Sequence, residues 1–318
     1  MALVTTRRGH GVKIPQDRAG WVVWVALPTA ALLLLSGCKG MFALVSPLSE
    51  QVASAERQDS DVSKGDLQAA IQSEDAVVAS SSATSIDGPT VITHPGSYRV
   101  TKDFSVDAAT GDGIVIRSDH VLLSLDGHTL TGPGNKVGRG IVIDHAAEVL
   151  VTRGTLKNFG IGVALLASSE SAVRFIEARG GDETANPAAG NPPQIGILLV
   201  DSFHNRIAKN HLDLINLGIF VRGGGSYDNK VRRNQVSAAT HGLLGICYNP
   251  VMGEGPAGPS KDEVTENLLD HFGTGIQVSE GSAHNEFERN VIRYIDHAWV
   301  DHNGSNEFER NKTIQVAP

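Results

Sequence analysis

Acidic and imidazole side chains occur together near the C-terminal end of the sequence. Asp270 directly precedes His271, and Asp296 directly precedes His297. An aspartate beside a histidine can orient the imidazole and raise its basicity, which suits a general base or a metal ligand. His241 lies at the same distance from a recurring asparagine as His297 does, so we expect the two to share one stripe. The candidate catalytic residues are therefore His241, Asp270, His271, Asp296 and His297, and no metal site is predicted.

A second chemically active residue, Cys38, follows a short apolar run near the N-terminus. Residues 1–20 carry four basic residues and one acidic residue, and residues 21–35 are apolar apart from Pro28 and Thr29. Fifteen helical residues rise about 22 Å, less than the roughly 30 Å of a bilayer core, so the pattern is typical of an export signal. The run ends Leu35-Ser36-Gly37-Cys38, which resembles the lipobox of bacterial lipoproteins. The resemblance implies cleavage after residue 37 and lipid attachment to Cys38.

The lipobox implies a protein of the cell envelope, anchored to a membrane through Cys38. Lys39 stands where an Asp would signal inner-membrane retention, so the pattern resembles an outer-membrane lipoprotein if the organism has two membranes. Loss of residues 1–37 changes the formal net charge from −8 to −11. An acidic surface disfavours nucleic acid as a partner, and we expect a monomer. Cys247 is then the one other cysteine, and its apolar neighbours predict a buried thiol.

Residues 38–86 are predicted to form a low-complexity tether that lifts the following domain off the membrane. The segment is poor in aromatic residues and contains the run Ser80-Ser81-Ser82-Ala83-Thr84-Ser85. Ser63 and Asp66 resemble a capping box, and they precede apolar residues at helical spacing, Leu67, Ala70 and Ile71. This pattern indicates a short helix, either docked as a cap on the domain or nascent in a flexible arm.

Past Asp87 the sequence repeats itself at short intervals. Segments that end in asparagine recur with spacings of 24, 33, 23 and 21 residues. A period near 22–24 is typical of a solenoid. The spacing of 33 contains an insertion at 249–260, and a second insertion spans 180–194; both are candidate binding loops or tolerated surface insertions. The terminal asparagines are Asn210, Asn234, Asn267, Asn290 and Asn311.

The phase of apolar residues within each repeat predicts several short strands. Apolar residues stand two after each asparagine and two or three before it, and no stretch keeps a helical period for twelve residues. The pattern indicates an all-β parallel β-helix of about nine coils, roughly 43 Å long. Asn tolerates left-handed backbone and its amide can bond its copies on adjacent coils, so this ladder is predicted to be structural. A glycine stripe is predicted to mark tight corners, at Gly113, Gly140, Gly160, Gly196, Gly218, Gly242 and Gly275.

Residues 87–318 resemble the right-handed parallel β-helix proteins of the pectin-lyase-like superfamily. That superfamily includes lyases, hydrolases, epimerases, adhesins and non-catalytic assembly factors, so the resemblance implies a fold and not one function. Its lyases need a base and often Ca²⁺, which would be the expected cofactor only for a lyase. Trp299-Val300-Asp301-His302 resembles a pectate-lyase signature, but the arginine-containing segment expected downstream is missing. We therefore treat that match as coincidence.

Three functions remain open on sequence alone. The preferred one is a lipid-anchored β-helix that binds polysaccharide or scaffolds an envelope assembly, because no recognisable catalytic signature is found. The first alternative is a polysaccharide lyase or glycoside hydrolase that acts on an acidic glycan through the Asp/His cluster. The second is a periplasmic metal-delivery factor, which the dispersed histidines allow although no tight metal-ligand spacing supports it.

Overall fold

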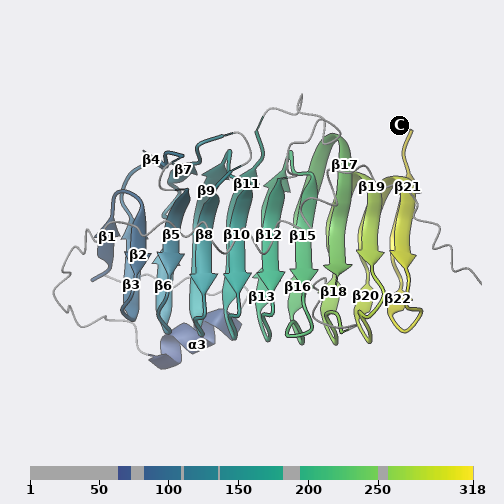
Figure 1. The fold of residues 1–318 in the computed structure, drawn as a ribbon, viewed down its shortest axis with the longest axis horizontal. Helices are drawn as coiled ribbons and strands as arrows, with labels where there is room; N and C mark the ends of the chain where they lie inside the picture. Colours follow the sequence, from purple (N-terminus) through teal and green to yellow (C-terminus); the bar gives the residue numbers. More distant parts are fainter. Residues whose placement is uncertain are drawn as a thin grey trace, which may run out of the picture.

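The protein is a parallel β-solenoid of about eight turns, close to the nine expected. A computed structural model describes residues 64–72, 82–108, 111–134, 137–181, 194–249 and 257–317, with side chains at all of these except residues 239–241. The lipobox with Cys38, most of the predicted tether and most of both insertions lie outside the described residues. Figure 1 shows the strands of successive turns stacked side by side along one axis.

Three faces, here named A, B and C in the order in which each turn visits them, form the wall of the solenoid. Face A stacks β2 (Thr90–Ile92), β5 (Asp112–Ile116), β8 (Arg139–Asp144), β10 (Ile161–Leu166), β12 (Ile195–Val200), β15 (Leu217–Arg222) and the C-terminal parts of β17 (Gln235–Asn249), β19 (Leu268–Val278) and β21 (Val291–Asp301). Every pairing within this face is parallel, as the repeat predicts.

Faces B and C complete each turn with shorter strands. Face B stacks β1 (Thr84–Ile86), β3 (Gly96–Val100), β6 (Val121–Ser124), β9 (Val149–Lys157), β11 (Ala172–Arg179), β13 (Arg206–Ala208), β16 (Lys230–Arg232), β18 (Glu263–Thr265), β20 (Glu286–Glu288) and β22 (Glu307–Glu309). Face C stacks β4 (Phe104–Ser105), β7 (Thr129–Thr131), β14 (His211–Asp213), β23 (Lys312–Gln315) and the remaining parts of β9, β11, β17, β19 and β21.

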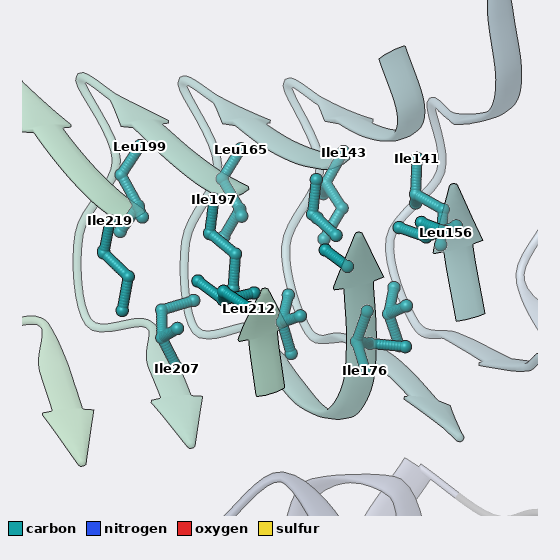
Figure 2. Packing of buried hydrophobic residues seen from close by; sticks show 14 of the residues in the cluster. Ile141, Ile143, Leu156, Leu165, Ile176, Ile197, Leu199, Ile207, Leu212 and Ile219 are labelled. Atoms are coloured by element: carbon teal, nitrogen blue, oxygen red, sulfur yellow. The ribbon is translucent and has the colours of Figure 1, made fainter. Parts of the chain in front are cut away.

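The core is a continuous column of aliphatic side chains enclosed by the three faces. On face A every second residue points inward, and on most turns the same position is filled by an aliphatic residue, with Tyr248 as an aromatic exception. Figure 2 shows this for Ile197, Leu199 and Ile219, which lie beside their counterparts on neighbouring turns. Burial of these side chains is the main source of stability for such a wall, at roughly 25 cal/mol for each Å² of apolar surface.

Two columns of side chains join the turns at the corners. In the predicted ladder, the Nδ2 of Asn234 donates to Oδ1 of Asn267 at 3.0 Å, and Asn267 does the same to Asn290. Each of these Nδ2 groups also donates to a main-chain carbonyl of the preceding turn. A second ladder, not predicted from the sequence, runs along the A–B corner through Asn205, Asn229, Asp262, Asn285 and Asn306.

The sequence predicts that the asparagine at the ladder corner has left-handed backbone, and this prediction is wrong. The left-handed residue is the one before the asparagine, with φ between 51° and 59° at Lys209, Arg233, Glu266, Arg289 and Arg310. The asparagine itself is needed because its side-chain oxygen accepts the main-chain N–H of the preceding turn's asparagine, as in Asn234 N–H to Asn267 Oδ1 at 3.0 Å. The corner is therefore held by side-chain hydrogen bonds that compensate for the backbone strain.

The glycine stripe is a place of close approach between turns and not a series of tight corners. A Cβ on Gly218 would lie 2.3 Å from the main-chain oxygen of Gly245, so no larger residue fits. On the turn after Gly218 the stripe passes through Gly245 and not through the predicted Gly242. Three turns before Gly245 it passes through Gly162 and not Gly160. A register shift between Ser237 and Gly242 explains the first difference, because it adds residues to that turn.

The domain starts earlier than predicted, and the short helix lies on its flank. β1 begins at Thr84 and pairs with β3, so the last residues of the predicted tether belong to the solenoid. Helix α3 (Lys64–Gln72) buries Leu67, Ala70 and Ile71 against face B, where it runs beside the first turns and not across their end (Figure 1). Among the described residues no helix is long and apolar enough to cross a bilayer.

We predict that the asparagine ladder contributes directly to stability. Asn290→Ala removes the partner of two donors on Asn267 and leaves them buried, which should cost about 1–3 kcal/mol in the free energy of unfolding. Asn303→Ala is the control, because Asn303 is exposed and belongs to neither ladder, so its loss should be smaller. Thermal and chemical denaturation measure both, and equal effects of the two variants would contradict the prediction.

Candidate functional site

The predicted Asp/His residues are divided among three consecutive turns of the solenoid, with His241 on β17, Asp270 and His271 on β19, and Asp296 and His297 on β21. Asp270 lies on face C, where its Oδ1 is 2.8 Å from Nδ1 of His271 and its Oδ2 is 3.3 Å from Nη1 of Arg293 on the next turn. Asp296 and His297 are exposed on β21. The side chain of His241 lies outside the described residues. The structure thus joins Asp270 to His271 and to Arg293, a residue absent from the predicted set.

The strand register does not align His241 with His297, although the predicted site requires both to lie on one stripe. His297 pairs with Thr274 as expected, but Thr274 pairs with Leu244 on the preceding turn and not with His241. The cause is the register shift between Ser237 and Gly242, which a count of residues from the asparagine cannot reveal. A single stripe through His241, Thr274 and His297 is therefore wrong, while a chemical role for the individual residues stays a prediction.

A hollow of about 470 Å³ lies on face B, just past the C-terminal end of α3. One wall is the A–B corner, and the other lining residues are the outward-facing first residues of the face B strands. Gln72 of α3 closes one end, where its Oε1 accepts a hydrogen bond from Arg206 at 2.6 Å. The lining residues are Gln72, His204, Arg206, Asp228, Asn229, Lys230, Lys261, Asp262, Glu263, His284 and Glu286.

Basic and acidic side chains both line this hollow, and some of them form no ion pair with the described residues. Lys230 Nζ lies 3.3 Å from Glu263 Oε2, and His204 Nε2 lies 3.4 Å from Asp228 Oδ2. Among the residues that the structure describes, Lys261, His284 and Glu286 form no ion pair, although all three line the hollow. A cation, an imidazole and a carboxylate thus converge on the same space, and their side chains form no hydrogen bond with the described part of the protein.

An aromatic pair adjoins this hollow on the A–B corner. The rings of Phe203 and Tyr227 stack with centroids 4.9 Å apart and planes 2° from parallel, and both residues are half-buried. His204 contacts both rings edge-on, at 5.2 and 5.3 Å between centroids. Flat aromatic surfaces next to polar groups are frequent in recognition sites because one end is apolar and the other can hydrogen-bond.

The sequence carried one signal for this hollow. His204, Asp228, Lys261 and His284 occupy the same repeat position, directly before the second ladder, and all have a φ between 51° and 58°. Their alignment was visible in the repeat. Their convergence with the end of α3 was not, because Gln72 and Arg206 are 134 residues apart.

Asp262 is the one carboxylate in the second ladder, and it is 1% exposed. Burial raises its pKa to about 7, against the hydrogen bonds from Asn229 and the Tyr248 hydroxyl, which lower it. In the ladder rungs on either side, Asn229 and Asn285, the second side-chain atom is an Nδ2 that donates two hydrogen bonds. An ionised carboxylate oxygen cannot donate, so only protonated Asp262 can reproduce the bonding of its neighbours.

We predict that the solenoid loses stability as the pH rises through this titration. The folded pKa of about 7 exceeds the ordinary 3.8, so between about pH 4 and 7 folding retains a proton that the unfolded chain releases, and a higher pH favours unfolding. Asp262→Asn restores a donor and should be about 1–4 kcal/mol more stable than the natural protein at pH 8, with little difference at pH 4.

Denaturation curves from pH 4 to 8 measure this effect. The matched control is Asn285→Asp, which introduces the same carboxylate one turn later and should show the opposite behaviour, with reduced stability at high pH. If Asp262→Asn left the pH dependence of stability unchanged, Asp262 would not be the titrating group.

Cys247 lies on face A and is 4% exposed. Burial raises the pKa of its thiol to about 12, so it is not a nucleophile at neutral pH. This agrees with the buried thiol expected from its apolar neighbours. In the described part of the chain, no three His, Cys, Asp or Glu side chains are grouped as metal ligands.

Comparisons with known proteins find similarity in the fold of the main chain and not in the sequence. No protein-family model matches the sequence, and no curated protein matches it. XylC, solved with xylose, is 12% identical with a TM-score of 0.45, over 64% of this chain and 36% of that chain.

Two further solved structures are similar. A tailspike protein mutant of E. coli bacteriophage HK620, solved with a pentasaccharide, is 11% identical with a TM-score of 0.43, over 74% of this chain and 51% of that chain. The A-module of a mannuronan C-5 epimerase from Azotobacter vinelandii is 13% identical with a TM-score of 0.24, over 80% of this chain and 95% of that chain. This chain thus covers about a third to a half of the first two structures, and no activity follows from these similarities.

Proposed function

We propose that this protein binds a segment of polysaccharide in the hollow on face B. The observation that carries the proposal is the mixture of lining groups, three cations facing four carboxyl groups together with two histidines and two amides. Sugar hydroxyls both donate and accept hydrogen bonds, so a neutral polyhydroxylated ligand can satisfy both kinds of group at once. The volume of about 470 Å³ falls in the range of small-molecule sites, and the stacked turns supply a rigid wall.

The binding prediction is tested on the unpaired groups. The double substitution Lys261→Ala with His284→Ala removes two side chains that form no ion pair with the described residues. It should weaken binding of any oligosaccharide that the natural protein binds at least about tenfold. Lys312→Ala on β23 is the matched control and should change nothing, because Lys312 is exposed on another face. Calorimetric titration against neutral and uronic-acid oligosaccharides provides the measurement.

The same titrations distinguish the alternatives. Loss of affinity for neutral sugars in the double variant supports the hollow as the site. Equal affinity of the double variant and the natural protein would rule it out, and an absence of binding to every glycan would favour a scaffold in an envelope assembly.

One contact favours a second candidate function, an enzyme acting on an acidic glycan. Asp270 Oδ1 and His271 Nδ1 lie 2.8 Å apart, close enough for the carboxylate to favour the protonated form of an imidazole that acts as a base. Asp296 lies close to Gly273 of the preceding turn, so the two acid–imidazole pairs belong to neighbouring turns. Turnover of uronic-acid polymers, measured with and without Ca²⁺, would establish this function only if it were lost on substitution of Asp270 and His297 together.

We also propose that the protein is held at a membrane of the cell envelope by lipid on Cys38, as the lipobox implies. Cys38→Ser should abolish incorporation of labelled fatty acid and leave the chain unprocessed. Cys247→Ser is the matched control, since it removes the other cysteine at a buried site. Continued fatty-acid incorporation in the Cys38→Ser chain would show that the lipobox reading is wrong.

A further inference from the structure

The strands of face A are apolar on both sides. While Ile141, Ile143 and their counterparts fill the core, the residues between them form a second apolar cluster on the outer side of the sheet. The register aligns Val115, Val142, Ala164 and Leu198 in one row across four consecutive turns. Ile161, Ile195 and Leu217 form a parallel row beside it. These seven residues are here called the outer apolar stripe.

The outer apolar stripe is shielded from solvent although it faces away from the core. Its residues are between 0% and 9% exposed, with Ala164 at 0% and Val142 at 1%. All members of the cluster and all half-buried apolar residues packed against it belong to strands of face A, so no apolar side chain of another described element packs on it. A patch of this size left open on a soluble surface would promote association.

Face B shows how this chain covers a comparable row. Leu122, Leu150 and Ala172 face outward on three consecutive turns of face B, and α3 covers them with Leu67, Ala70 and Ile71. The polypeptide that precedes the solenoid therefore already serves as a cover for outward-facing apolar residues. The chain before α3 is the natural continuation of that cover.

We propose that residues 41–45, Met-Phe-Ala-Leu-Val, bind to the outer apolar stripe of face A. These five consecutive apolar residues stand out from the polar composition of residues 46–63 that follow them. The 18 residues between Val45 and Lys64 span at most roughly 60 Å when extended. Helix α3 lies on face B beside turns that also carry the stripe, and face B meets face A at the A–B corner. The segment can therefore reach the stripe from the fixed position of α3.

Accessibility of a cysteine placed in the stripe tests this proposal in the full chain. Ala164→Cys puts a thiol at the most shielded position with little change of volume, and maleimide labelling of that residue is followed by peptide mass spectrometry. Replacement of residues 41–45 by a Gly/Ser sequence should raise the labelling rate at position 164 at least about tenfold, because the cover is lost. Leu198→Cys provides a second probe, and the circular dichroism of each variant reports whether the solenoid is folded.

Glu286→Cys is the matched control, since this exposed position on face B should react at the same rate with and without residues 41–45. Rapid labelling at position 164 in the otherwise natural chain would overturn the proposal, because the stripe would then be open. Persistent protection after replacement of residues 41–45 would also overturn it and assign the cover to another occupant. Dependence of that protection on protein concentration would identify a second copy of the chain.

Discussion

The hydrogen bonds that side-chain amides make from one turn to the next are the constraint on which this structure depends. Each asparagine in the ladder accepts from the turn before it and donates to the turn after it, so all turns must keep one spacing and one register at the corner. The left-handed residues beside the ladder are tolerated because these bonds compensate for the strain. The close approach at Gly218 and Gly245 is possible because glycine has no Cβ. A rigid wall with a fixed repeat is the result.

Because the repeat is regular, residues at the same repeat position line up in columns on the surface. His204, Asp228, Lys261 and His284 are far apart in the chain, yet they line one side of a hollow because each precedes the same ladder position. The second ladder carries one carboxyl group, and its burial at the corner changes the acid–base behaviour of that group. Asp262 takes the place of an amide donor at a buried corner, so its pKa rises toward neutrality and links the stability of the wall to pH.

Apolar residues outside the core reveal a second level of organisation. Face B and face A both carry outward-facing apolar rows, and α3 covers the first. The polypeptide before the solenoid thus contributes to its surface and does not only connect it to an anchor. The end of α3 also closes the hollow on face B through Gln72, so this segment influences the proposed binding site.

The sequence by itself determined the parallel β-solenoid, its asparagine ladder and the buried state of Cys247, because these depend on residue types that recur once in every turn. It also indicated the short helix that became α3. Only the tertiary structure decided the strand register around His241, the hollow on face B and the pKa of Asp262. The physical reason is that these depend on contacts between segments up to 134 residues apart and on burial from water, and no repeat spacing encodes either of them.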